Sequence, residues 1–248
     1  MTILVQREFR VGRADRTEFE RQSREGVWPA FLEFGAKMVA YGRWEFGADD
    51  GGVLTHTAYE DLAHWEATRR EGPRGPGTYY ADPVIGPLVA PLLDQSSARG
   101  ALVSSTSSRL LEVDEGVSRL DVHRRTADGP AASRPPTFGL GSVVSERTYL
   151  LRPGTLSEFR RLSLEVWPWL ERMGGRLVAF GQDPLHTADE VVTLFAFRSL
   201  SDWHRYSRPS AELDPPPEVV SAWNQRASLI LSNQGRLLTV LTDFGTPV

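Results

Sequence analysis

Residues 18–29 read Glu-Phe-Glu-Arg-Gln-Ser-Arg-Glu-Gly-Val-Trp-Pro, and residues 158–168 read Glu-Phe-Arg-Arg-Leu-Ser-Leu-Glu-Val-Trp-Pro, which is one residue shorter. The likeness continues along both copies, with 35–42 matching 174–181, 53–65 matching 191–203, Arg99 matching Arg226, and Arg109 matching Arg236. A period near 140 residues is far too long for a solenoid, so each copy is expected to be a whole small domain. The repeat therefore predicts a fused dimer.

Length and charge limit the class of protein. The chain has 248 residues, which is enough for two domains of about 100–120 residues. Its formal net charge of −4 argues against nucleic acid, because binding to nucleic acid calls for a basic surface. No apolar run approaches the roughly 18 residues that a membrane span needs, and the N-terminus lacks the apolar core of a signal peptide. We expect a cytoplasmic protein with no nucleic-acid and no membrane partner.

The residue types that the chain lacks exclude several chemistries. There is no cysteine, which excludes thiolate nucleophiles, disulfides, iron–sulfur clusters and cysteine-ligated zinc. Lys37 is the only lysine, so a Schiff-base mechanism has one candidate. The sequence also lacks a glycine-rich phosphate loop, a nucleophile elbow and a His-Glu-x-x-His motif. These absences argue against common kinases, hydrolases and dehydrogenases.

The alternation of residue types predicts the elements of each copy. Residues 3–11 and 143–151 alternate with the period of two that is typical of a half-buried strand. Apolar residues at helical spacing then predict a helix that begins near Thr155 or Ser157 and ends at Gly174-Gly175. Two strands, a second helical region and a last strand follow, with strands expected at 38–44, 53–59 and 109–113 in the first copy and at 177–182, 191–197 and 236–241 in the second.

The order of these elements is β-α-β-β-α-β, the ferredoxin-like unit, in which helices cover one face of an antiparallel sheet. The predicted fold class is therefore α+β, with two ferredoxin-like domains packed sheet to sheet as an intramolecular dimeric α/β barrel. We place the first domain at 1–116, a linker at 117–141 and the second domain at 142–248. The linker is rich in proline, and a short strand is expected at 117–123.

Several short motifs carry a resemblance to a known family. They are Arg147-Thr-Tyr149 followed by Arg152-Pro-Gly154, the run Gly-x-x-Leu-Val-x-x-Gly at 174–181, and the strand 191–197 leading to Trp203. On these residues the chain resembles the NIPSNAP family of the dimeric α/β-barrel superfamily. The resemblance covers both copies but not the linker, and the first copy matches less well.

The resemblance implies a fold more than a reaction. Its superfamily includes cofactor-independent monooxygenases, polyketide cyclases, isomerases, decarboxylases and haem proteins, so the fold leaves the function open. The family's third strand tends to carry histidine and tryptophan before a closing aromatic residue, whereas this chain has Thr55 and Thr57 before Tyr59. A role of that histidine is therefore not transferred. A fused chain with a diverged first half resembles a protein of secondary metabolism.

Arg7 and Arg147 occupy the same position in the first strand of each copy. If their side of the strand faces the space between the sheets, each arginine can hold a carboxylate, an enolate or a phenolate. The alternative is an internal ion pair with a nearby glutamate, or a position near the solvated end of the strand. Aromatic residues are expected to line a substrate pocket there, or else to fill the core; they are Tyr41, Trp44, Tyr149, Phe180 and Phe197.

His56 breaks the repeat, because Leu194 stands at its position in the second copy. A lone imidazole on a strand can act as a general base or acid near neutral pH, and Tyr59 is a second candidate for moving a proton. The alternative is a histidine that is exposed or internally hydrogen-bonded. No organic cofactor is expected, but haem is kept open, with His56 as its axial ligand.

The remaining histidines do not form a metal-binding pattern. None of them shows the i, i+4 pair or the spacing to carboxylates that a metal site requires; they are His64, His123, His186 and His204. No metal is therefore expected.

Two hypotheses about function follow from these residues. The first is a cofactor-independent enzyme of secondary metabolism that acts on a small aromatic or polyketide-like substrate by proton transfer, in a cyclisation, isomerisation or oxygenation. In it Arg7 or Arg147 stabilises an anionic intermediate, and His56 or Tyr59 moves the proton. The second is a non-catalytic small-molecule-binding, haem-binding or assembly protein. A homodimer of the fused chain is left open.

Overall fold

The structure is a computed structural model in which residues 1–46, 52–70, 75–118, 120, 122 and 138–242 are described. The described chain divides into two compact units. Of the described residues, unit 1 consists of 1–43, 52–70 and 75–110 together with 120 and 122, and unit 2 consists of 44–46, 111–118 and 138–242. None of the described helices is long and apolar enough to cross a membrane.

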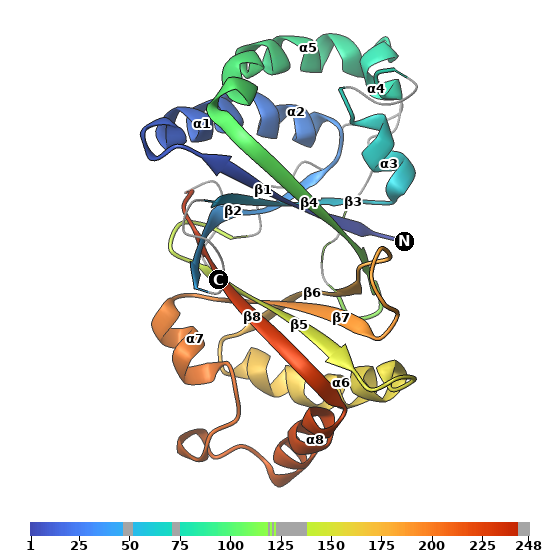
Figure 1. Ribbon diagram of the computed structural model, residues 1–248, viewed down its shortest axis with the longest axis vertical. Helices are drawn as coiled ribbons and strands as arrows, with labels where there is room; N and C mark the ends of the chain where they lie inside the picture. Colours follow the sequence, from blue (N-terminus) through green and yellow to red (C-terminus); the bar gives the residue numbers. More distant parts are fainter. Residues whose placement is uncertain (47–51, 71–74, 119, 121, 123–137, 243–248) are drawn as a thin grey trace. The chain divides into compact units, whose positions relative to one another are not determined.

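Unit 1 contains a sheet with the strand order β4-β1-β3-β2, covered on one face by helices (Figure 1). Strand β3 lies antiparallel to both β1 and β2. The elements in chain order are β1 (Ile3–Val11), the 3-10 helix η1 (Arg13–Asp15), α1 (Arg16–Gln22), the π-helix η2 (Ser23–Val27), α2 (Trp28–Glu33), β2 (Lys37–Phe46), β3 (Gly52–Tyr59), α3 (Leu62–Ala67), α4 (Thr78–Ala81), α5 (Ile85–Gln95), the 3-10 helix η3 (Ser97–Leu102) and β4 (Val103–Val113). The last residues of β2 and β4 belong to unit 2.

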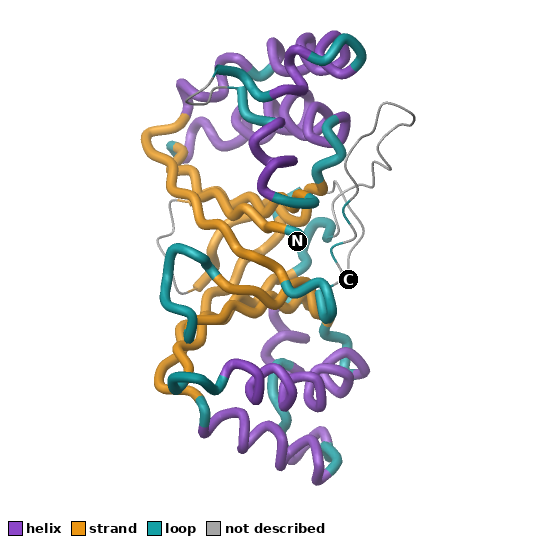
Figure 2. The backbone as a smooth tube through the Cα atoms, turned by 90° about the vertical axis from the view of Figure 1, so that its right-hand side faces the viewer, coloured by secondary structure: helices purple, strands orange, loops and turns teal. Residues whose placement is uncertain are grey.

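Unit 2 repeats this arrangement with the strand order β8-β5-β7-β6. Strand β5 lies antiparallel to β7 and β8, and β6 lies antiparallel to β7. Its helices also lie on one face of the strands, as the tube view shows (Figure 2). The elements are β5 (Val143–Leu151), α6 (Leu156–Arg172), β6 (Arg176–Gln182), β7 (Glu190–Phe197), α7 (Leu200–Tyr206), the 3-10 helix η4 (Ala211–Leu213), α8 (Pro217–Ser228) and β8 (Ile230–Val240).

The predicted fold class is confirmed, because each unit has the element order and the sheet of the ferredoxin-like fold. The sheet-to-sheet packing stays a prediction. The strand expected at 117–123 is not formed at the residues described there. The chain turns instead, with the amide of Ser118 donating to the carbonyl of Asp114 at 2.9 Å and the Ser118 hydroxyl accepting from the Phe180 amide at 3.0 Å. Most of the predicted linker lies outside the described residues.

The pleat of the first strand in each unit decides which side chains meet the helices. Phe9 on β1 packs against Phe19 on α1 with ring centroids 5.3 Å apart, and Tyr149 on β5 packs against Phe159 on α6 at the same distance. Because side chains alternate along a strand, residues two positions away share this face. Arg7 and Arg147 therefore face the helices. The condition set for their role in the sequence analysis, that this side of the strand faces a space between the sheets, is therefore not met.

The extra residue of the first copy lies inside a helix. The segments α1, η2 and α2 follow one another without a break, whereas α6 of unit 2 is a continuous α-helix. A single π-helical turn inside a helix holds one additional residue. Gly26, in η2, is the residue without a counterpart, and a Cβ atom there would lie 2.4 Å from the carbonyl oxygen of Leu92 and 2.8 Å from the Cβ of Ser96. The insertion therefore sets the helix backbone directly against α5, where only glycine fits.

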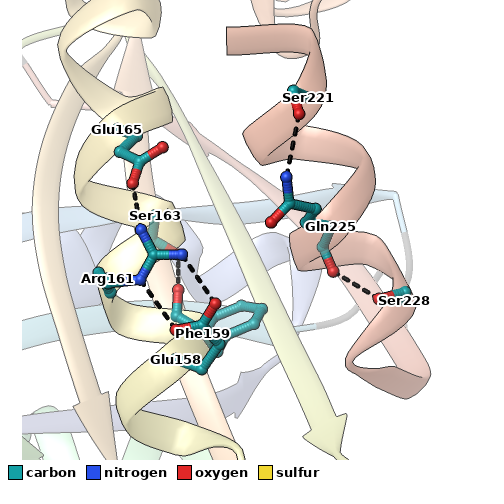
Figure 3. A network of polar contacts seen from close by, with 8 residues as sticks. All are labelled: Glu158, Phe159, Arg161, Ser163, Glu165, Ser221, Gln225 and Ser228. Atoms are coloured by element: carbon teal, nitrogen blue, oxygen red, sulfur yellow. Dashed lines mark hydrogen bonds and ion pairs between the residues drawn. The ribbon is translucent and has the colours of Figure 1, made fainter. Parts of the chain in front are cut away.

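The repeated sequence motif also builds the same ion-pair network on the exposed side of each first helix. In α6 the Arg161 guanidinium donates to Glu158 at 2.8 Å through Nε and also pairs with Glu165 (Figure 3). Arg21 makes the two corresponding contacts in unit 1. Exposed pairs of this kind contribute about 0.2–1 kcal/mol each. These exposed pairs therefore contribute little to stability compared with the packing of the buried side of the helix.

Replacing the inserted glycine tests the close packing of η2 on α5. We expect Gly26→Ala to lower the free energy of unfolding by about 1–3 kcal/mol, because the added methyl group overpacks a backbone contact. Urea denaturation followed by circular dichroism measures the change. Gly100→Ala is the matched control in the same unit, since a Cβ atom there meets no atom within 4 Å. Equal stability of the two variants would contradict the packing described.

Candidate functional site

A cavity in unit 2 lies between the sheet and the helices that cover it. Strands β5 and β7 form its floor, and α6, α8 and the residue that follows α7 form its walls. The space open to the centres of water-sized molecules is about 30 Å³, and the empty volume including the opening to solvent is about 370 Å³. About 10–15 Å³ measured in the first way holds one water. The cavity therefore admits a small group, such as the head of a larger ligand.

Arg226 of α8 is a buried cation at this cavity, with only 5% of its surface exposed. Its guanidinium carbon lies 4.4 Å from the ring centroid of Phe159 and 5.0 Å from that of Tyr149. Nε of Arg226 has no hydrogen-bond partner among the described residues, and none of their carboxylates pairs with it. Contacts with ring faces stabilise a desolvated cation by about 2 kcal/mol. They do not supply the oxygen acceptor that a buried guanidinium calls for.

Arg147 of β5 lines the same cavity and is half-buried. It stands opposite Thr193 on β7 and Gly235 on β8, and it has no ion-pair partner among the described residues. The alternative weighed for Arg147, an internal ion pair with glutamate, is therefore not found in the described part of the chain. Two arginines at one small cavity suit an oxyanion, which a guanidinium binds with two parallel hydrogen bonds.

The other polar groups of the cavity are hydroxyls. They belong to Ser145, Thr193, Ser207 and Tyr149. Among the described residues that line the cavity there is no histidine, aspartate or glutamate. The apolar part of the wall includes Phe197, one of the predicted substrate-binding residues. The cavity can therefore hold an anion against aromatic rings, but it offers few groups that could remove a proton.

In unit 1 the arginine at the position of Arg226 is Arg99, and another side chain of the unit accepts a hydrogen bond from it. The guanidinium of Arg99 lies 4.0 Å from the Phe19 ring and 4.6 Å from the Phe9 ring. Its Nε donates a hydrogen bond of 2.7 Å to the hydroxyl of Ser23. Burial, with a smaller contribution from the charge of Arg7, lowers the pKa of Arg99 to about 10.

The two predicted tyrosines of unit 1 are also under the helices. Tyr41 packs edge-on against Trp28 with centroids 5.0 Å apart, and burial raises its pKa above the usual range. Tyr59 is fully buried beside Phe31 and His64. Burial raises the pKa of Tyr59, while the nearby charge of Arg7 lowers it. Tyr59 is thus a buried phenol near a cation and is not open to solvent.

His56 lies on β3, on the face opposite to that of Tyr59, and is 0% exposed. The side-chain amide nitrogen of Gln6 lies 3.0 Å from its Nε2. Since an amide nitrogen can only donate, Nε2 of His56 accepts this bond and carries no proton. His56 and Tyr59 point to opposite faces of β3, because they are three positions apart. The structure therefore does not bring these two predicted catalytic residues together.

Trp44 and Phe180, two of the predicted substrate-binding residues, do not line the cavity themselves. Trp44 lies under the guanidinium of Arg236 at 4.2 Å, and Arg236 also pairs with Glu146, which is 1% exposed. This cluster is on the face of the sheet away from the helices. Phe180 packs against Trp167, a cavity residue, with centroids 5.4 Å apart. Trp44 is therefore remote from the cavity, and Phe180 supports its wall.

The structure thus gathers Arg147, Tyr149 and Phe197 at one cavity. Arg226 is the charged residue of the cavity to which the sequence analysis gave no role. A signal was present, because Arg226 and Arg99 match across the repeat. Their place at the end of the second helical region of each copy did not reveal that the guanidinium reaches back to the first strand.

No cluster of three or more potential metal ligands is found among the described residues. His186 lies near two carboxylates, with its Nδ1 2.9 Å from Glu190 and its Nε2 3.9 Å from Asp183. His186 is half exposed in the β6–β7 hairpin.

Solved structures resemble the whole chain in fold. A candidate monooxygenase from Lactobacillus acidophilus NCFM covers 98% of this chain and 97% of its own, with a TM-score of 0.62 and 8% identity. A candidate monooxygenase from Fusobacterium nucleatum covers 100% and 97%, with a TM-score of 0.62 and 11% identity. An anthrone oxidase-like protein covers 97% and 91%, with a TM-score of 0.52 and 13% identity. Identities this low show the fold alone.

Shorter matches also occur. A NIPSNAP family protein from Agrobacterium tumefaciens covers 43% of this chain and 90% of its own, at 22% identity and a TM-score of 0.35. The resemblance predicted from the sequence is confirmed at the level of the fold, and the full-length matches carry that conclusion. No protein-family model and no curated protein matches the chain.

The buried tyrosines predict how the protein responds to alkali. Burial raises the pKa of Tyr80 from 10.0 to about 12, and it raises the pKa of Tyr41 and Tyr59 in the same direction. A group whose pKa is higher in the folded state contributes stability that is complete below its unfolded pKa and is lost as the pH rises through the folded pKa. The protein should therefore lose stability between about pH 10 and pH 12.

Tyrosinate absorbance and circular dichroism, recorded together as the pH rises, test this. We expect the tyrosinate signal of Tyr41 and Tyr59 to appear together with the loss of structure. Tyr80→Phe should reduce the loss of stability in this range. Ionisation of all six tyrosines near pH 10 with an unchanged dichroism spectrum would contradict the burial described.

Proposed function

We propose that the chain is an enzyme that acts on a small aromatic substrate without an organic cofactor, and that the cavity of unit 2 is its active site. The observation that carries the proposal is the pair Arg147 and Arg226, two cations at one small cavity with no carboxylate partner among the described residues. Such a pair stabilises negative charge that develops on a bound substrate. Protein that excludes water from Arg226 strengthens this interaction.

The kind of substrate follows from what the cavity offers. Its described lining residues include no histidine or carboxylate, so the substrate must ionise readily. A phenol or the enol of a 1,3-diketone does so, and its anion can react with dioxygen directly. Oxygenation is therefore favoured over isomerisation of an unactivated ketone. The fold likeness to candidate monooxygenases and to an anthrone oxidase-like protein agrees with this choice.

A second candidate function is non-catalytic binding of a small organic anion. The same lack of proton-transfer groups in the cavity favours it. Haem is not favoured in either case, because the candidate axial ligand His56 is fully buried and its Nε2 already accepts a bond from Gln6. The residues around His56 therefore do not fit a haem iron.

Oxygen consumption tests the enzyme. Purified protein treated with EDTA is mixed with anthrone or 2-naphthol, which supply an acidic enol and a phenol. We expect turnover in the wild type and a fall in kcat/KM of about 10²–10³-fold in Arg226→Gln, as for removal of one charge-stabilising donor. Arg21→Gln, which alters an exposed helix arginine, is the control. Equal turnover by Arg226→Gln and the wild type would sink the proposal.

Addition of haemin tests the haem alternative. We expect no Soret band characteristic of axial histidine ligation, because Nε2 of His56 is engaged by Gln6. A ligated Soret band that disappears in His56→Ala would contradict this expectation and favour the haem-binding alternative.

A further inference from the structure

The two units differ at the residues that surround their paired arginines. Tyr41 and Tyr59 of unit 1 align with Phe180 and Phe197 of unit 2. The strand registers agree with the alignment, since Tyr41 pairs with Thr55 as Phe180 pairs with Thr193. At these two positions unit 1 therefore carries hydroxyls under its helices that unit 2 lacks, whereas Tyr149 of unit 2 carries a hydroxyl where unit 1 has Phe9.

In unit 1 the protein supplies polar partners to its own arginines. The hydroxyl of Ser23 accepts the hydrogen bond from Nε of Arg99 at 2.7 Å. Tyr41 lies close enough to Arg99 to interact with it electrostatically, and Tyr59 interacts with Arg7 in the same way. Arg99 of unit 1 thus has a hydrogen-bond partner from the chain itself, and two tyrosine hydroxyls lie under the same helices.

In unit 2 no hydroxyl of the described residues accepts a bond from Nε of Arg226. Phe180 and Phe197 have no oxygen. The hydroxyl of Ser163 donates to the carbonyl of Phe159 at 2.7 Å (Figure 3), as that of Ser23 does to the carbonyl of Phe19 in unit 1. Tyr149 brings a hydroxyl to the cavity where unit 1 has Phe9, but that hydroxyl does not contact Nε of Arg226 either. Arg226 is nonetheless more than nine-tenths buried and borders a cavity. A buried cation of this kind needs an acceptor from elsewhere.

We propose that the chain has one oxyanion site, in unit 2, which takes the carboxylate or phenolate oxygen of a small aromatic acid between Arg147 and Arg226, and that hydroxyls of the protein close the equivalent place in unit 1. The head of the acid fits the cavity of about 30 Å³, and the aromatic residues that line the cavity, Trp223 among them, would contact its ring. The inference concerns binding at the cavity of the proposed function and does not require turnover.

Titration calorimetry at neutral pH tests the site, with benzoate and 4-nitrophenolate as anionic probes and benzamide as the neutral control. We expect one binding site per chain for at least one anion and none for benzamide. Arg226→Gln should weaken binding at least tenfold, whereas Arg99→Gln, the matched change in unit 1, should alter it less than twofold. The two anions distinguish a carboxylate site from a phenolate site.

A second variant keeps the test decisive if Arg226→Gln unfolds. Phe197→Tyr introduces into unit 2 the hydroxyl that Tyr59 provides in unit 1, and it should weaken anion binding while the circular dichroism spectrum stays unchanged. Two sites per chain, no binding of either anion, or equal losses in Arg226→Gln and Arg99→Gln would overturn the inference. Tight binding without turnover would instead refute the proposed enzyme and leave the site in place.

Discussion

A guanidinium stacked on two aromatic rings is the interaction on which the interior of each unit depends. Arg99 covers the rings of Phe9 and Phe19, and Arg226 covers those of Tyr149 and Phe159. In both units it joins the end of the second helical region to the first strand and the first helix. A leucine could fill the same volume at lower electrostatic cost. We therefore explain the positive charge at this position by the group that it can bind, and not by a contribution to stability.

The pleat of the strands distributes the remaining polar groups between two environments. On the helix-facing side are Arg7, Arg147 and the tyrosines. On the other side are His56 with Gln6, and Glu146 with Arg236. Each of these last pairs is joined by a hydrogen bond or an ion pair. The helix-facing side is therefore the better candidate for binding a ligand, because Arg7 and Arg147 have no carboxylate partner among the described residues.

The repeat and the two periodicities were sufficient to predict the ferredoxin-like units and most of their elements. They could not predict the orientation of the first strand, because both of its faces carry apolar residues and only the contact of Phe9 with Phe19 decides between them. For the same reason, the sequence did not predict that Arg147 and Arg226 line one cavity. Arg226 is 79 positions away in sequence, and no local pattern links a residue near the end of a helix to the middle of a distant strand. The predictions for the aromatic residues were correct only in part, since Tyr149 and Phe197 line the cavity but Trp44 does not.

The π-helical turn at Ser23–Val27 has a consequence for how such chains are compared. Changes in length are usually expected in loops, where they disturb no packed face. Here one residue is gained in mid-helix, and the wider turn lets the residues on either side keep their orientation toward the sheet. The offset between the copies is 140 before Gly26 and 139 after it. An alignment that forbids gaps inside helices would rotate half of this element by about 100° and pair core positions with surface ones. Distant relatives of this chain are therefore easier to align by the inward-facing residues than by helix length.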